Sequence, residues 1–277
     1  MTDPLRQLLA RTRFELVPMK GVDQAIADLP AGAPVSVTCS PAKGIPATLD
    51  LAGRLHDLGH DTVPHLSART VEDRHHARRI AAWLRDHGVR EVFVIAGDGA
   101  RARGPYEDAL TFLRDLLDAS PGLAAIGVPG YPDHHPFIGE RELHGLLRAK
   151  LAVIADAGLA GSVTTQMCLD APHILRWLTH ERERGLDVPV DIGVAGVVDR
   201  AKLLTMGVRL GVGTSLRFLR KNRAVVTSMF APGGYDPTDL VTAIAEDARR
   251  LSVRGLHSYT FNRVAPTLAW REQLLAE

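Results

Sequence analysis

The sequence predicts an α/β protein of the (β/α)8 class, a TIM barrel. Eight short apolar segments recur along almost all of the 277 residues, and segments with helical periodicity separate them. No Pro/Ser-rich linker divides the chain, and its length fits the roughly 250 residues that such a barrel needs. The hydrophobic fraction of 45% is sufficient for a large core. We therefore expect one (β/α)8 barrel domain spanning residues 1–277.

The eight apolar segments are expected to be strands, because near-continuous apolar runs are typical of parallel strands buried on both faces. In chain order they are residues 14–18, 35–39, 62–66, 92–98, 124–128, 162–166, 190–194 and 256–260. An open doubly wound sheet fits the alternation almost as well. The count of eight and the lack of a glycine-rich dinucleotide turn favour the barrel.

The segments between the strands show apolar residues at helical spacing. We expect helices over residues 48–58, 71–87, 106–117 and 140–157, an extra helix over 216–222 and a loop over 231–236. Glycine suits the left-handed conformation that ends many helices. It follows several of the helical segments, as Gly59, Gly88, Gly158, Gly185 and Gly207.

Composition excludes several classes of function. A formal net charge of +1 gives no reason to expect nucleic acid or an anionic membrane surface as a partner. No apolar run approaches the roughly 18 residues that span a bilayer, and the first residues contain no apolar signal core. We expect a cytoplasmic protein. Cys39 and Cys168 are expected to be reduced thiols, since two such cysteines make neither a disulfide framework nor a zinc motif.

Polar side chains lie on or near the carboxyl ends of the predicted strands, where the active sites of such barrels are found. Five of them are candidates: Glu15, Thr38, His65, Asp98 and Gln166.

Three of these side chains each allow two interpretations. Glu15 is either a rim residue paired with an arginine or a carboxylic acid that donates a proton. Asp98 is either a helix cap or a ligand contact, beside a Gly97 that would let a flat ligand approach. Gln166 either satisfies a polar neighbour or binds the donor and acceptor edge of a heterocycle.

A metal site is not expected. Asp133, His134 and His135 are adjacent in the chain, but neighbouring histidines point in different directions and no third ligand has a telling spacing. His65, as an isolated histidine at a strand end, is either structural or a ligand contact.

Seven short motifs, taken in chain order, carry a resemblance to a known family. They are Phe-Glu at 14–15, Ser-Val-Thr at 36–38, Pro-His-Leu at 64–66, Gly-Asp at 97–98, Tyr-Pro-Asp-His-His-Pro at 131–136, Thr-Gln at 165–166 and Tyr-Thr-Phe-Asn-Arg at 259–263. Together they resemble the motifs of methylenetetrahydrofolate reductases, which include Arg-Gly-Asp, Tyr-Pro-Glu-x-His-Pro and Tyr-Thr-Leu-Asn-Arg. The resemblance covers nearly the whole chain.

The resemblance implies a reaction and roles for residues. The reaction is reduction of 5,10-methylenetetrahydrofolate to 5-methyltetrahydrofolate. Glu15 would be the general acid that protonates N10 and so opens the five-membered ring. Asp98 would favour the cationic character of N5. Substrate binding would fall to Gln166 at the pterin, to Arg263 at the folate tail, where a guanidinium fork suits a carboxylate, and to Thr38.

The resemblance also implies a flavin site, and here the sequence departs from the family. The positions matching flavin contacts are His65, Gly97, Tyr106, Tyr131 and His135, together with Thr38. The family arginine before Gly-Asp is replaced by Ala96, and a basic helical run that neutralises the flavin pyrophosphate is replaced by apolar residues 151–155. Lys150 would restore one charge at most.

We therefore expect NADH or NADPH to pass hydride directly to the folate, with the folate and the nicotinamide nucleotide as small-molecule partners. An FAD-dependent reductase is the first alternative. A folate-binding or methyl-transfer partner protein without reductase activity is the second, and the presence of Glu15 argues against it.

Overall fold

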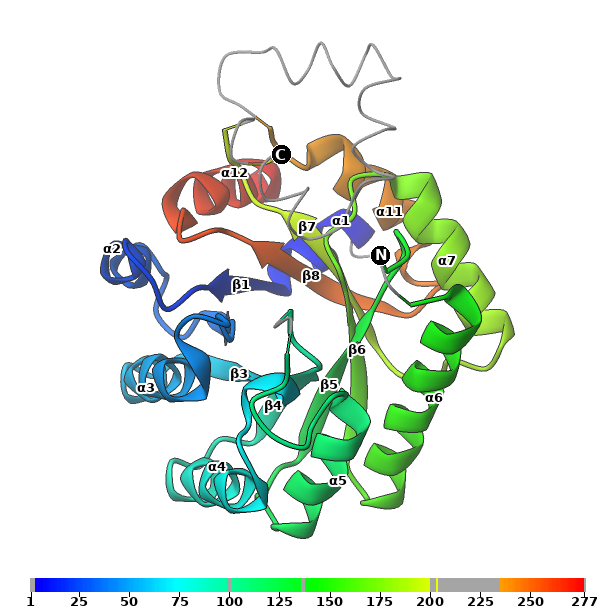
Figure 1. The fold of residues 1–277 in the computed structure, drawn as a ribbon. Coiled ribbons are helices and arrows are strands. Elements are labelled where there is room, and N and C mark those ends of the chain that lie inside the picture. The colour runs from blue at the N-terminus through cyan, green and yellow to red at the C-terminus, as the bar shows by residue number, and fades with distance from the viewer. Residues whose placement is uncertain (1–2, 99–100, 136–137, 200–202, 204–234, 277) are drawn as a thin grey trace.

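A closed barrel of eight parallel strands forms the centre of the molecule (Figure 1), in a computed structural model that describes residues 3–98, 101–135, 138–199, 203 and 235–276. The strands follow one another around the barrel in chain order, and β8 pairs with β1. They are β1 (Thr12–Leu16), β2 (Pro34–Val37), β3 (Asp61–Ser67), β4 (Glu91–Ile95), β5 (Ala125–Gly130), β6 (Ala160–Thr165), β7 (Val190–Ala195) and β8 (Val253–Tyr259). The predicted (β/α)8 class is confirmed.

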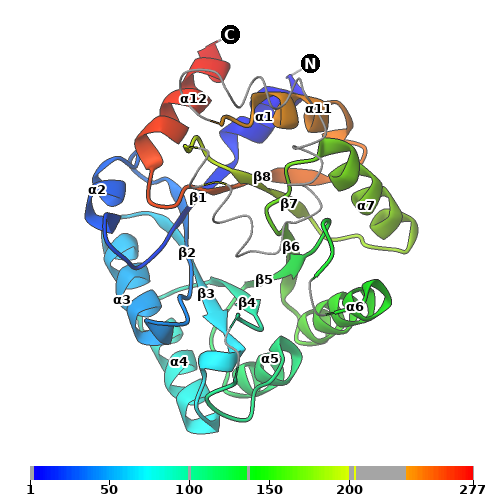
Figure 2. The ribbon, with the colours of Figure 1, turned by 45° about the horizontal axis from the view of Figure 1, so that its top comes forward.

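Helices surround the barrel (Figure 2). They are α1 (Pro4–Ala10), α2 (Val22–Ala27), α3 (Gly44–Asp57), α4 (Arg74–Asp86), α5 (Ala109–Asp118), α6 (Glu140–Asp156), α7 (Ala171–Glu183), α11 (Thr238–Ala248) and α12 (Val264–Ala276), with a short 3-10 helix η1 (Ala68–Thr70). Helix α1 precedes the first strand and contacts β8, α11 and α12. None of the helices described is long and apolar enough to cross a membrane. The extra helix expected over 216–222, most of the loop expected over 231–236, and Gly207 lie outside the described residues.

Two helices start three residues later than the sequence pattern suggested, because a carboxylate cap fixes each start. Asp73 accepts a hydrogen bond from the backbone N of His76 at 2.6 Å, so α4 begins at Arg74 rather than at residue 71. Asp108 accepts one from the backbone N of Thr111 at 2.9 Å, so α5 begins at Ala109 rather than at residue 106. A side chain that accepts from these backbone donors satisfies the helix end.

The other end of the helices agrees with the sequence. Positive φ angles, between 64° and 86°, occur at the glycines that follow α3, α4, α6 and α7, which are Gly59, Gly88, Gly158 and Gly185. Both cysteines, Cys39 and Cys168, are buried thiols that form no disulfide in the described part of the chain, as expected.

The barrel interior is polar at the amino ends of its strands. Arg13 on β1 donates to the Asp61 carboxylate at 2.8 Å and to the backbone O of Val35 at 3.1 Å. Arg254 on β8 forms a two-pronged ion pair with Asp191 on β7. Arginine and carboxylate satisfy one another in this geometry, so charged groups can occupy the barrel without being left unpaired.

The seam between β1 and β8 closes the barrel, and side-chain hydrogen bonds reinforce it. Asn262, just past β8, accepts from the backbone N of Val17 at 2.8 Å and donates to its O at 2.9 Å. Thr260 donates to the backbone O of Glu15. Phe261 and Asn262 both have positive φ, and asparagine tolerates this conformation well. The chain after β8 is thereby held against the chain after β1.

We predict that Asn262→Ala lowers the free energy of unfolding by about 1–3 kcal/mol, because both backbone groups of Val17 lose their partner. Chemical denaturation at neutral pH measures this. The control is Gln24→Ala, which removes one exposed bond to Asp28 and should change stability by less than about 0.5 kcal/mol. Equal effects of the two changes would mean that the Asn262 bonds do not hold the seam.

Candidate active site

A carboxylate and two imidazoles meet inside the barrel. Glu15 on β1, His65 on β3 and His257 on β8 are all buried, with exposed fractions of 6%, 5% and 3%. Glu15 Oε2 lies 3.1 Å from His257 Nε2, within hydrogen-bond distance. The rings of His65 and His257 are stacked with centroids 5.9 Å apart. Because the carboxylate has a direct partner, Glu15 is not the arginine-paired rim residue that was one of its two interpretations.

His65 lies in the middle of β3 rather than at its end, against the ring of Phe93 at 4.7 Å. Burial lowers the pKa of His65 well below 6.5, and its electrostatic interactions with His257 and Arg13 lower it further. His65 is therefore neutral at physiological pH. His65 lies in the same buried layer of side chains as Glu15. This position favours a structural role for His65 over contact with a cofactor at the barrel rim.

Two tyrosines lie nearer the carboxyl ends of the strands. The ring of Tyr259 packs edge-on against His257 at 4.9 Å, and its hydroxyl donates to the backbone O of Thr165 at 3.1 Å. Burial raises the pKa of Tyr131 to about 12, and the nearby Asp98 contributes to this rise. Both phenols are therefore protonated at neutral pH and able to donate.

Asp98 is exposed and lies three residues beyond the end of β4. It is not the cap of α5, a role taken by Asp108. Its charge acts on His135 as well as on Tyr131. Burial lowers the pKa of His135, and Asp98 opposes this shift. The ring of His135 meets that of Tyr131 edge-on at 5.2 Å, so these three predicted residues gather at one part of the barrel mouth.

The predicted folate-binding residues also follow strand ends. Gln166, one residue past β6, is partly buried, and its Oε1 accepts from the backbone N of Met167 at 2.8 Å. Thr38, one residue past β2, is partly buried. Arg263, after β8, is about half exposed and forms an ion pair with Asp199 at 3.1 Å. A folate carboxylate at Arg263 would compete with this ion pair.

Two predicted cofactor contacts have other structural roles. Gly97 has a φ of 94°, and a Cβ there would lie 1.9 Å from Ser67 Oγ, so its backbone position already requires glycine. Tyr106 is fully buried in the outer core, packs against Phe112 and donates to Asp115 at 2.7 Å. A contact between Tyr106 and a bound flavin would require this side chain to leave the core.

Sequence reasoning missed His257, which completes the buried cluster. A signal was available, because His257 is two residues before Tyr259 and alternate residues of a strand point to the same side. The Tyr-Thr-Phe-Asn-Arg motif at 259–263 begins two residues after His257 and does not include it. Glu15 and His257 are far apart in the chain. Their contact can therefore be predicted only when β1 and β8 are known to pair.

The residues that would hold a flavin pyrophosphate offer little positive charge. Lys150 on α6 is 7% exposed, and burial lowers its pKa to about 8, opposed by the charge of Asp108. The following turn of α6, residues 151–155, presents no side-chain hydrogen-bond donor. These side chains therefore do not fit the flavin phosphates, which favour charge-assisted contacts.

Glu15, His65 and His257 also have ligand atoms within 4.8 Å of one another, a separation that would allow a metal ion. The carboxylate and His257 already bond directly. The absence of a metal at this cluster remains a prediction.

Comparisons with known proteins agree with the motifs. A family model described as methylenetetrahydrofolate reductase matches residues 31–274. Methylenetetrahydrofolate reductase 2 of Saccharomyces cerevisiae is 28% identical over 127 residues, a match that covers 42% of this chain and 20% of the yeast protein. A lysine decarboxylase from Selenomonas ruminantium has a TM-score of 0.48 and 14% identity, over 94% of this chain and 58% of that one. At these values the decarboxylase carries no argument about fold or activity.

We predict that His65 makes stability fall as the pH drops below about 6.5. Its folded-state pKa is depressed, so the unfolded chain binds a proton that the folded chain rejects. The free energy of unfolding should lose up to about 1.4 kcal/mol per pH unit from this residue. Denaturation curves between neutral pH and pH 5 should therefore show a shallower dependence in His65→Gln. The exposed His75→Gln is the control, and parallel curves for parent and His65→Gln would contradict the assignment.

Proposed function

Because the chain belongs to the methylenetetrahydrofolate reductase family, we propose that it reduces 5,10-methylenetetrahydrofolate to 5-methyltetrahydrofolate. NADH or NADPH is the proposed donor. The observation that carries the proposal is the buried Glu15 carboxylate inside the barrel, hydrogen-bonded to His257. Aligned residues make up one fifth of the yeast relative, so the activity is inferred from this site and not transferred from that protein.

The reaction needs one hydride and one proton. The hydride from nicotinamide C4 goes to the methylene carbon, and the proton goes to N10, which leaves the one-carbon group on N5. A carboxylic acid and a neutral imidazole in contact can share one proton, since either partner can carry it. We assign Glu15 as the acid and His257 as the residue that positions and reprotonates it. Burial of both keeps bulk water from the proton.

The barrel mouth supplies the remaining roles. Asp98 is exposed beyond the end of β4 and would stabilise the cationic iminium by its charge. Gln166 would bind the pterin with the amide group that now bonds to Met167. Arg263 would exchange its ion pair with Asp199 for a carboxylate of the folate tail. Thr38, Tyr131 and His135 border the same region and would contact folate or nicotinamide.

Direct transfer from nicotinamide is favoured over a flavin relay by the chain's own residues. Ala96 and residues 151–155 provide no charge for a pyrophosphate, Lys150 is buried, and Tyr106 is held in the core. The alternative is a reductase that holds FAD by backbone groups instead. A folate-binding protein without activity is the second alternative, and a buried acid with a proton-sharing partner argues against it.

We predict that Glu15→Gln keeps the fold and folate affinity but loses activity by a factor on the order of 10²–10⁴. The amide preserves the shape and a hydrogen bond to His257 but has no acidic proton to give. Initial rates and folate binding are measured on the same preparations. Glu272→Gln, an exposed change on α12, is the control with unchanged rate. Near-normal turnover of Glu15→Gln at every pH would exclude the proposed role.

We predict that deuterium at C4 of the nicotinamide appears in the product methyl group when flavin has been removed from the protein. Direct transfer also requires a ternary complex, so reciprocal plots should intersect, whereas a flavin relay gives parallel lines. The visible spectrum of the purified protein provides the control, since bound oxidised flavin is yellow. Activity that returns only with added FAD would establish the flavin alternative.

A further inference from the structure

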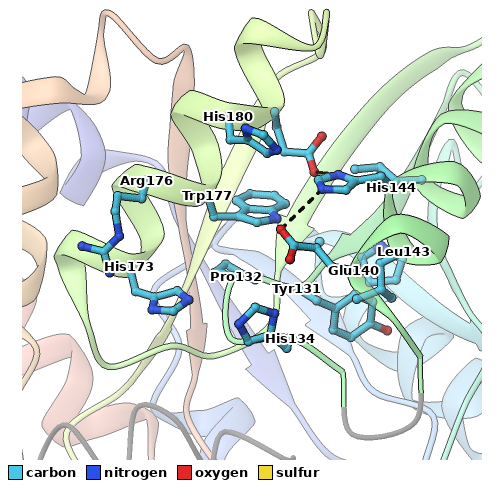
Figure 3. A pocket seen from close by; sticks show the side chains of 14 residues that line it. Tyr131, Pro132, His134, Glu140, Leu143, His144, His173, Arg176, Trp177 and His180 are labelled. Atoms are coloured by element: carbon cyan, nitrogen blue, oxygen red, sulfur yellow. Dashed lines mark ion pairs between the residues drawn. The ribbon is translucent and has the colours of Figure 1, made fainter.

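A second group of histidines lies outside the barrel, in a cavity of about 330 Å3 between α6, α7 and the segment after β5 (Figure 3). The proposed folate reductase uses none of the residues that α6 and α7 contribute to it. Two of these, Glu140 and His144, lie one helical turn apart on α6, and His180 faces them from α7. Residues four apart lie on the same face of a helix, so both α6 side chains point to the same part of the cavity.

We propose that Glu140, His144 and His180 form a binding site for a divalent transition metal ion, with Zn2+ as the expected occupant. One ligand atom from each residue lies within 4.8 Å of the other two. Two imidazoles and one carboxylate are a ligand set that zinc accepts, with a fourth position left for water or a ligand donor. All three residues line the cavity, so that fourth position would face it.

The hydrogen bonds of His144 prepare it as a ligand. Its Nδ1 lies 2.5 Å from the Glu181 carboxylate, which is almost fully buried. Its Nε2 is buried and has no hydrogen-bond partner among the residues that the structure describes. A carboxylate on one ring nitrogen fixes the tautomer that leaves the other nitrogen free for a metal. Arg148 in turn contacts Glu181 at 3.3 Å, which holds the carboxylate in place.

The distances suit an ion better than a direct contact. His144 Nε2 and Glu140 Oε1 are 3.8 Å apart, too far for a hydrogen bond. A tetrahedral ion about 2.1 Å from each ligand would separate the two ligand atoms by about 3.4 Å. The Glu140 side chain is 64% exposed and can turn to close this difference.

Sequence spacing alone does not reveal this site, because its ligands come from two helices that only the fold brings together. The adjacent histidines after β5, His134 and His135, are not among the three ligands. His173 on α7 lines the same cavity as His180 but lies outside the ligand cluster, so it supplies a matched control.

The test is direct measurement of metal binding by the chelator-treated protein without an affinity tag. Titration calorimetry with zinc should give one saturable site per chain, and Co2+ should give the visible absorption of a tetrahedral ion. Glu140→Gln and His180→Asn should each weaken zinc binding by at least about 10–100-fold, the loss expected even for residues that only support a ligand. His173→Asn should leave the affinity unchanged.

Three results would overturn the proposal. One is the absence of saturable zinc binding by the parent protein. Another is binding that survives both Glu140→Gln and His180→Asn, which would place the ion elsewhere, for example at the Glu15 cluster. The third is equal weakening by His173→Asn, which would indicate a general effect on the cavity. Circular dichroism confirms that each variant is folded, and the readout does not depend on reductase activity.

Discussion

The hydrogen bond between Glu15 and His257 depends on the closure of the barrel between its first and last strands. These residues are separated by almost the whole chain and meet only because β1 pairs with β8. Thr260 and Asn262 hold the same seam through the backbone of Glu15 itself and of Val17, two residues later. A buried carboxylate is costly without a partner, so the seam and the acid stabilise each other. The proposed chemistry thus rests on the strand pair that completes the fold.

The two ends of the barrel have different physical roles. At the amino ends, arginine and carboxylate pairs such as Arg254 with Asp191 satisfy one another. Toward the carboxyl ends, Asp98 is exposed, Glu15 hydrogen-bonds to His257, and Tyr259 donates to a backbone carbonyl. In (β/α)8 barrels generally, the active site lies at the carboxyl end and the amino end contributes stability. The location of Glu15, Asp98 and the two tyrosines toward the carboxyl end agrees with this division.

The sequence predicted the barrel, its strands to within a few residues and Glu15 as the acid candidate, because buried parallel strands leave long apolar runs. It misplaced the starts of α4 and α5, where Asp73 and Asp108 override the apolar periodicity. It could not predict the Glu15–His257 contact, the burial of Tyr106 or the convergence of α6 and α7, because these depend on which elements become neighbours. Gly97 is another example. A side chain at position 97 would clash with Ser67, so packing requires glycine there whether or not a ligand approaches.

The central claim is that Glu15 delivers a proton to N10 of a folate bound at the carboxyl end of the barrel. A crystal structure of the protein with 5-methyltetrahydrofolate tests it most directly. The account predicts that the pterin lies between Asp98 and Gln166, with N10 about 2.6–3.2 Å from the Glu15 carboxylate or joined to it through one water molecule. A folate bound with N10 turned away from Glu15, or bound outside the barrel mouth, would contradict the account.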